Sequence, residues 1–287
     1  MSLRPPVLPT DSAALAHFWA DMPPPAIAAS HRDLAGAIAA GSPYLRQLML
    51  RDPTDAGEVF AADPDALMSG ILKELAALDP ALTMAEAMRR MRRLKRRAAL
   101  LIAVADLSGQ WPLSKVTDAL TRFADASLQA ALQWLIGDLV RTGKFSVADP
   151  GDPLKGSGYV VLAMGKQGAC ELNYSSDIDL IVLYDHQCPG LPADADVSTF
   201  FVRLTRRLVQ MMQEVTEDGY VFRSDLRLRP DPRATQVAIS VEAAAVYYEN
   251  QGQNWERAAM IKARAAAGDI ALGEEFLDRL KPYIWRK

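Results

Sequence analysis

The chain has 287 residues, of which 50% are hydrophobic and 23% are charged, and its formal net charge is −3. This composition is ordinary for a globular protein, and the length is enough for one large or two modest domains. A net charge this close to zero gives no general argument for nucleic acid or an anionic membrane as a partner, and we expect neither.

Cysteine, histidine and apolar patterning exclude several further classes. Two cysteines, Cys170 and Cys188, cannot build a disulfide framework or a four-thiolate zinc site. No window approaches the ~20 apolar residues that span a membrane, and "MSLRPPVLPTD" lacks the apolar stretch of a signal peptide. We therefore expect a cytoplasmic protein.

The first ~150 residues are predicted to be helical, because apolar residues recur at helical spacing between Pro and Gly breaks. Residues 10–22 and 30–53 show this pattern, and 82–109 show it most clearly. There Thr83 and Glu86 form a capping box, and Gly109 marks the end. The predicted apolar stripe comprises Met88, Met91, Leu94, Ala98, Leu101 and Ile102. Residues 112–143 predict another long helix.

A stretch rich in Pro, Gly and Asp at 146–159 changes the pattern, and short strands follow at 159–164, 177–185 and 220–230. Between them, 198–219 predicts a helix that ends at Gly219, and Ser240 is predicted to cap a helix over 241–252. Its neighbour over 254–268 is expected to bury Trp255. The fold class is therefore α+β and predominantly helical. The predicted buried face of 198–219 comprises Phe201, Leu204, Leu208, Met211 and Val215.

Two aspartates stand at the start of the strand "DIDLIVLYD". Side chains alternate along a strand, so Asp177 and Asp179 point the same way, about 6.6 Å apart at the backbone. Such a pair suits Mg²⁺, which takes one or two carboxylates together with phosphate oxygens. A lone pair of this kind is most often a solvated strand end.

The strand predicted over 220–230 carries Arg223, Asp225, Arg227 and Arg229 on one face. If this strand pairs with the one predicted over 177–185, Asp225 becomes a third metal ligand beside Asp177 and Asp179. Arg227 and Arg229 would then be placed to hold phosphate oxygens through bidentate bonds.

The turn "GKQG" precedes the aspartates and fits the same chemistry. Gly165 lets the backbone bend and expose amide donors, Lys166 adds a positive charge, and Ser175 and Ser176 add hydroxyls. The Walker spacing is absent, so this is no P-loop. Each feature alone has an ordinary structural explanation, but their order together favours a site that binds a metal and phosphate groups.

That order resembles the DNA polymerase β-like nucleotidyltransferase superfamily, and more closely the family of bifunctional glutamine synthetase adenylyltransferases/adenylyl-removing enzymes. The resemblance lies in "AMGKQGACELNYSSDIDLIVLYD", "DLRLRP", "GQNWERAAMIKARAAAGD" and "MRRLKRRAALLIAVADLSG". It implies a helical region over 1–115 and a catalytic domain over 116–287 with a small mixed sheet flanked by helices. One departure is Gln167, where the family usually has leucine.

The family has two similar halves, and this chain resembles the amino-terminal half, so we expect a fragment of a longer protein. The resemblance implies removal of AMP from an adenylylated tyrosine of glutamine synthetase, with phosphate attacking and ADP released. Two Mg²⁺ ions, or Mn²⁺, would be held by Asp177, Asp179 and Asp225. The implied phosphate-side and nucleotide-side residues are Gly165, Lys166, Ser175, Ser176, Arg227 and Arg229.

Adenylylated glutamine synthetase and a PII-type nitrogen regulator are the implied macromolecular partners. Two alternatives stay open: another nucleotidyltransferase of the same superfamily, or a non-catalytic module that only binds glutamine synthetase or the regulator. A basic run of seven cations between Arg89 and Arg97 is interpreted mainly as a solvated, packing helix. Contact with an acidic partner surface is its second interpretation.

Overall fold

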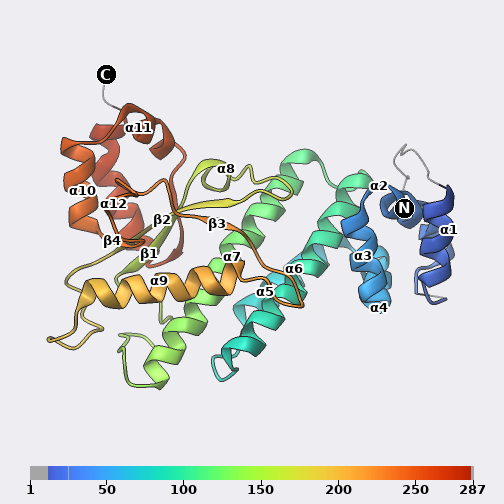
Figure 1. Cartoon of the computed structure of the whole chain (residues 1–287), viewed down its shortest axis with the longest axis horizontal. Coiled ribbons are helices and arrows are strands. Elements are labelled where there is room, and N and C mark those ends of the chain that lie inside the picture. Colours follow the sequence, from blue (N-terminus) through green and yellow to red (C-terminus); the bar gives the residue numbers. More distant parts are fainter. Residues whose placement is uncertain (1–11, 25, 286–287) are drawn as a thin grey trace. The chain divides into compact units, whose positions relative to one another are not determined.

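The computed structural model describes residues 12–24 and 26–285 (Figure 1). The sequence interpretations of residues 1–11, including the expected start of the first helix at residue 10, lie outside this part. By contacts the chain divides into two compact units, one of residues 1–74 and 93–123 and one of 75–92 and 124–287. The domain division at 115/116 stays a prediction.

The first unit is built from short helices whose starts are written in the sequence. Three Ser or Asp residues each precede a proline, which suits the first helical position because it lacks an N–H group. Ser42 accepts from Leu45 N at 3.3 Å, and Asp52 accepts from Asp55 N at 3.0 Å. The helices are α1 Ser12–Asp21, α2 Arg32–Gly41, α3 Pro43–Arg51, α4 Pro53–Ala61 and α5 Pro64–Ala76, with a 3-10 turn at Ala29–His31.

Two long helices contribute residues to both units: α6 Met84–Leu107 and α7 Leu113–Arg141. The predicted capping box at the start of α6 is confirmed, since Glu86 accepts from Thr83 N at 2.8 Å and Thr83 accepts from Glu86 N at 3.3 Å. All six residues of the predicted apolar stripe are buried. Gly109 has a φ of 72°, as a residue just beyond a helix end often does.

The second unit contains a mixed sheet in the order β3-β2-β1-β5, with β4 also paired to β2. Strand β1 runs antiparallel to β2 and β5, whereas β3 and β4 run parallel to β2. This confirms the predicted α+β class with a small mixed sheet. The strands are β1 Tyr159–Ala163, β2 Ile178–Tyr184, β3 Ser224–Asp225, β4 Ile239–Ser240 and β5 Arg264–Gly268.

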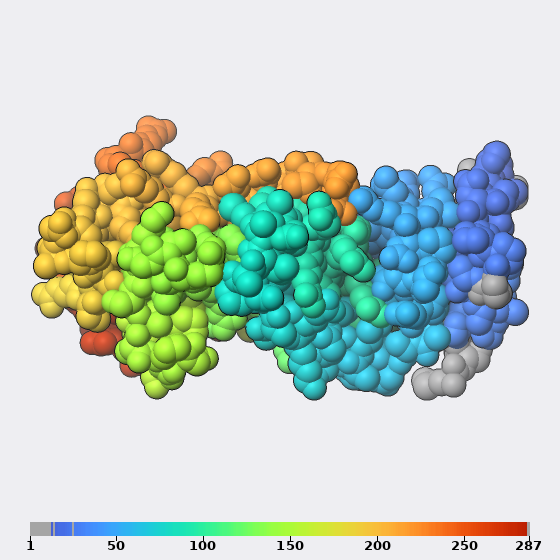
Figure 2. All heavy atoms as spheres, turned by 90° about the horizontal axis from the view of Figure 1, so that it is seen from below, coloured from blue at the N-terminus to red at the C-terminus, as the bar shows by residue number. Residues whose placement is uncertain are grey.

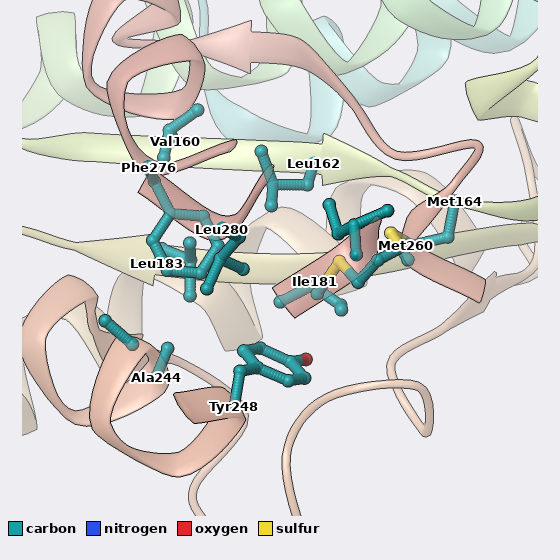
Figure 3. Close-up of a cluster of buried hydrophobic side chains, with 12 residues drawn as sticks. Val160, Leu162, Met164, Ile181, Leu183, Ala244, Tyr248, Met260, Phe276 and Leu280 are labelled. Carbon is teal, nitrogen blue, oxygen red and sulfur yellow. The ribbon is translucent and has the colours of Figure 1, made fainter. Parts of the chain in front are cut away.

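Helices cover both faces of this sheet. On one face, Val160, Leu162, Ile181 and Leu183 pack against side chains from α10 Val241–Asn250 and α12 Ile270–Ile284 (Figure 3). Full burial of each such aliphatic side chain stabilises the fold by roughly 1.5–3 kcal/mol. Helix α11, Asn254–Met260, adds Met260 to this cluster.

On the opposite face lies α9, Val197–Gln213. Phe201 stacks on Tyr159 and Tyr184, with ring centroids 5.6 and 5.1 Å apart. The carboxyl-terminal half of α7 lies beside α9, and Figure 2 shows their atoms adjoining in green and gold. Arg207 of α9 lies within 3.4 Å of the Asp138 carboxylate of α7, so the two helices are joined by charge as well as packing.

Several predictions about these elements are wrong. The helix expected over 254–268 ends at Met260, because residues 264–268 pair with β1 and form β5. The strand expected over 220–230 is reduced to Ser224–Asp225 because the Asp225 side chain accepts from Arg227 N at 2.8 Å. That local bond makes a turn and ends the strand. The helix expected over 198–219 ends at Gln213, and Val215 is 75% exposed. Gly219 lies instead in a tight turn with Thr216, with a φ of 86°.

Trp255 is 52% exposed rather than part of the core. Its neighbour Glu256 turns inward to complete a capping box with Gln253, and adjacent helical residues point in different directions. The capping of α10 by Ser240 is confirmed, at 3.2 Å from Ala243 N. Within the described ranges, we find no helix with both the length and the apolar character that crossing a membrane requires.

Candidate active site

The site begins at the turn between β1 and β2, where the glycines are needed for close approach. Helix α8, Gly165–Gly168, is a single turn. A Cβ atom on Gly168 would lie 2.0 Å from the carbonyl oxygen of Lys262, so no larger residue fits there. Gly165 has a φ of 54°, and a Cβ atom on it would lie 2.9 Å from Oδ2 of Asp179. The turn therefore leaves room directly beside that carboxylate.

Asp179 and Asp225 are register partners on the parallel strands β2 and β3. Partners in register present their side chains on the same face of a sheet. A bond from Ile178 N to Arg223 O, 2.9 Å long, fixes this register. Asp177 immediately precedes β2. The structure thus brings the three predicted carboxylates to one edge of two neighbouring strands.

The carboxylates differ in how their charge is balanced. Asp177 forms an ion pair with Arg223, and Asp225 forms one with Arg227. The hydrogen bonds from Arg227 are the main cause that lowers the pKa of Asp225. Within the described residues no arginine pairs with Asp179. Partial burial, followed by repulsion from Asp225 and Asp177, raises the pKa of Asp179.

The predicted phosphate-side residues differ in how far they are exposed and in whether they already bond to other groups. Lys166 is exposed on α8. Ser175 has a φ of 56° and its carbonyl accepts from Arg223, while the Ser176 hydroxyl donates to the Asn173 side chain. Arg229 is not free on the surface: its two Nη atoms donate to the carbonyls of Leu226, Pro232 and Thr235. It closes the loop after β3. Its positive charge adds to the effect of Arg227 in lowering the pKa of Asp225.

The sequence did not reveal the polar cluster that holds α8. Gln167 is buried and donates to Asp125 Oδ1 of α7 at 2.9 Å. Arg264 of β5 donates to Asp125 Oδ2 at 2.8 Å and to the Gln167 carbonyl at 3.2 Å. The departure from leucine at Gln167 was the available signal, but it could not name the partners because they lie 42 and 97 residues away.

A second group that the sequence did not reveal supports the loop after β3. Glu256 is 2% exposed, and both of its carboxylate oxygens accept from the Tyr247 hydroxyl at 3.2 Å. Burial raises the pKa of Tyr247, and a backbone hydrogen bond from Asp231, which follows Arg229 and Pro230, partly lowers it. Helices α10 and α11 therefore help to hold the segment that carries the arginines.

The donor set fits a hard divalent cation. Three carboxylates supply the oxygen ligands that Mg²⁺ and Mn²⁺ prefer. Across residues 12–24 and 26–285, no three Asp, Glu, His or Cys side chains stand in an arrangement that could hold a metal ion as they are oriented. Two of the three carboxylates are turned to Arg223 and Arg227. The pair of Asp177 with Arg223 is exposed on both sides, whereas Asp225 is largely covered and its partner Arg227 is exposed. Exposed ion pairs of this kind are weak.

Comparisons with known proteins identify the family to which this chain belongs. Residues 32–279 match the family described as glutamate-ammonia ligase adenylyltransferase. The chain is 50% identical over 250 residues to the bifunctional glutamine synthetase adenylyltransferase/adenylyl-removing enzyme of Xanthobacter autotrophicus, covering 87% of this chain and 25% of that protein. It is 50% identical over 261 residues to the protein of that name from Bradyrhizobium diazoefficiens, covering 89% and 26%.

The chain thus spans about a quarter of the length of the curated relatives it matches. The matched region nonetheless contains the whole sheet and all three aspartates of the site. On the extent of the family match and this level of identity, the chain belongs to the glutamate-ammonia ligase adenylyltransferase family.

Proposed function

We propose that this chain removes AMP from an adenylylated tyrosine of glutamine synthetase by phosphorolysis. The observation that carries the proposal is the register pairing of Asp179 with Asp225, beside Asp177 and the open turn at Gly165. The relatives are named for both attaching and removing adenylyl groups. "SSDIDL" and "GQNWERAAMIKAR" resemble the amino-terminal half of the family, which favours removal.

The chain's part in this reaction is mostly positioning and charge balance. Asp177, Asp179 and Asp225 would hold Mg²⁺ ions, which supply neutralisation of the phosphate oxygens and stabilisation of the leaving phenolate when bound. Lys166 on α8 and Arg227, the partner of Asp225, are both exposed, and they would orient the incoming phosphate by charge. Gly165 leaves the approach to Asp179 open.

The bonds balance without any further reactant. An oxygen of inorganic phosphate forms a bond to the phosphorus of the adenylyl group, and the bond from that phosphorus to the tyrosine oxygen breaks. The products are ADP and a free tyrosine, which takes up a proton. The unperturbed pKa of tyrosine is near 10, so charge stabilisation of the leaving oxygen is where the site helps most.

The macromolecular partners follow from the same proposal. Adenylylated glutamine synthetase is the substrate, and a PII-type regulator is the proposed controller of the reaction. The attachment of AMP from ATP is the second candidate, since the names of the relatives cover it equally.

The test gives the chain adenylylated glutamine synthetase, Mg²⁺ and inorganic phosphate and measures ADP by chromatography. A parallel reaction supplies unmodified glutamine synthetase with ATP and measures incorporated AMP by mass spectrometry. We expect ADP only in the first reaction, and Asp179→Asn should abolish it. AMP incorporation without ADP release would replace removal with attachment, and binding without either product would leave a non-catalytic module.

A further inference from the structure

Arg223 holds three different acceptors around the candidate site. Its Nε donates to the Asp177 carboxylate, its Nη2 donates to the carbonyl of Ser175 at 2.8 Å, and its Nη1 donates to the Tyr220 hydroxyl at 3.4 Å. The side chain is still 54% exposed. A solvent-facing guanidinium therefore sits next to a proposed metal ligand while two uncharged groups hold it in place.

Arg227 provides an internal contrast. Its Nε lies 2.9 and 3.0 Å from the two carboxylate oxygens of Asp225, two residues earlier in the chain, and its side chain is 83% exposed. Among the described residues its guanidinium has no hydrogen-bond partner besides Asp225. If Asp225 turned away, nothing would fix Arg227, whereas Arg223 would keep its bonds to Ser175 and Tyr220.

We propose that Arg223 has two alternating partners: it neutralises Asp177 while no divalent cation is bound, and it binds a phosphate oxyanion once Asp177 turns to the cation. This inference rests on the proposed function and adds a residue to it. A guanidinium has five N–H donors, so the two fixed bonds leave three donors for phosphate oxygens. Arginine is well suited to that role because its planar donors match a phosphate in a bidentate manner.

The proposal predicts effects of opposite sign on two ligands. Removing the guanidinium frees Asp177 and takes a positive charge away from the cation site, so the cation should bind more tightly. The same change removes donors from the phosphate, so phosphate should bind less tightly. A residue that merely braced the turn at Ser175 would weaken both when removed.

The experiment uses the whole 287-residue chain and the substitution Arg223→Gln. Mn²⁺ binding is followed by electron paramagnetic resonance without phosphate, and inorganic phosphate and AMP are titrated separately by calorimetry in saturating Mg²⁺. We expect Mn²⁺ to bind about threefold more tightly, because an exposed competing ion pair is lost. We expect inorganic phosphate to bind about tenfold more weakly, because charge-assisted hydrogen bonds are lost.

Arg206→Gln is the matched control, since Arg206 is an exposed arginine on α9 and its loss lowers the net charge equally. It should change neither affinity. Arg223→Lys keeps the charge but cannot bridge three acceptors, so Mn²⁺ affinity should stay near that of the unaltered chain while phosphate affinity falls. A larger loss for AMP than for inorganic phosphate would assign the oxyanion to the nucleotide rather than to the attacking group.

Loss of the proposed metal site and loss of the proposed role of Arg223 give different results. Unaltered chain that binds no Mn²⁺ would overturn the proposed metal site and this role with it. If the unaltered chain binds Mn²⁺ normally, either of two results would overturn the role of Arg223 alone. One is weaker Mn²⁺ binding in both Arg223 variants, and the other is an unchanged affinity of the variants for both phosphate compounds. Circular dichroism of each variant shows whether it is folded, and the lysine variant decides the question if the glutamine variant is not.

Discussion

The guanidinium of Arg92 donates a 2.8 Å hydrogen bond from Nε to the carbonyl of Gly219, 127 residues later in the chain. It also donates to Glu214 O at 2.5 Å and to Met88 O at 3.1 Å, and the side chain is fully buried. One cation from the basic run of α6 thus holds the turn between α9 and β3. That turn lies five residues before β3, the strand that carries Asp225.

Substitution of Arg92 should therefore change stability rather than partner binding. Arg92→Ala leaves three carbonyls without their donors and is expected to lower the free energy of unfolding by about 2–4 kcal/mol. Urea unfolding followed by circular dichroism measures this. Arg93→Ala is the neighbouring control, because Arg93 is exposed and should stay within about 0.5 kcal/mol. Equal effects of the two substitutions would contradict the structural role.

Contact with an acidic partner surface is therefore proposed only for the exposed cations of the basic run. Lys95 lies 5.6 Å from the ring centroid of Phe123, and burial lowers its pKa to about 8. Arg97 pairs with Asp55 and Glu58 at 2.9 and 2.6 Å. Charge reversal at Arg93 is the appropriate test: the hypothesis predicts weaker, less salt-dependent association with glutamine synthetase, and unchanged association would leave only the packing role.

Asp179→Asn should separate activity from stability. The substitution removes a proposed metal ligand, so ADP release is expected to fall at least ~100-fold. Because partial burial, and after it repulsion from the neighbouring carboxylates, raises the pKa of Asp179, its charge destabilises the fold at neutral pH. The neutral amide should therefore raise the melting temperature by roughly 1–2 °C. Calorimetric melting in a chelator measures this, and a lower melting temperature would contradict the electrostatic environment described above.

The same raised pKa predicts a pH dependence of activity. Asp225 has a lowered pKa and stays ionised to more acidic pH than Asp179 does. As the pH falls, Asp179 is therefore the first of these two to take up a proton and to lose its capacity as an anionic ligand. The acidic limb of ADP release should lie above the range of an ordinary aspartate and should move to lower pH in saturating Mg²⁺. An acidic limb that ignores Mg²⁺ concentration would count against Asp179 as its origin.

Gly168→Ala should be among the single-methyl substitutions in the second unit that lower the free energy of unfolding most. The added methyl group would lie 2.0 Å from the Lys262 carbonyl and 2.6 Å from the Ala163 carbonyl, so backbone must move. We expect a loss of about 3 kcal/mol or more in unfolding free energy. Gly70→Ala is the control, since the space around Gly70 on α5 is open and alanine should stabilise that helix by about 0.5–1 kcal/mol.

The Gln167–Asp125–Arg264 cluster should depend on Asp125 far more than on Gln167. Gln167→Leu removes one hydrogen bond but also a buried amide oxygen that has no partner, so we expect a change within about 1 kcal/mol. Asp125→Ala leaves the Gln167 amide without its acceptor and Arg264 with only the Gln167 carbonyl, and it should lower the unfolding free energy by about 2–3 kcal/mol. Urea titrations of both variants compare them directly. Equal losses would show that the two residues act through packing alone.

Local signals explain which elements the sequence determined. The capping box at Thr83, the apolar stripe of α6, the strands at Tyr159 and Ile178 and the helix cap at Ser240 were all correct. Each depends on residues within a few positions of one another, so periodicity and capping chemistry suffice. The alternation at Asp177 and Asp179 likewise indicated a shared face before any partner strand was known.

Partnerships between distant segments were decided only by the tertiary structure. The pattern over 254–268 predicted a helix throughout, but residues 264–268 pair with the distant strand β1 and form β5. The burial of Arg92 depends on carbonyls more than 120 residues away, and the exposure of Trp255 depends on Glu256 turning inward. The sequence pattern predicts which face of an element a side chain lies on. Only the folded chain determines which hydrogen-bond acceptor or charged group lies opposite that face.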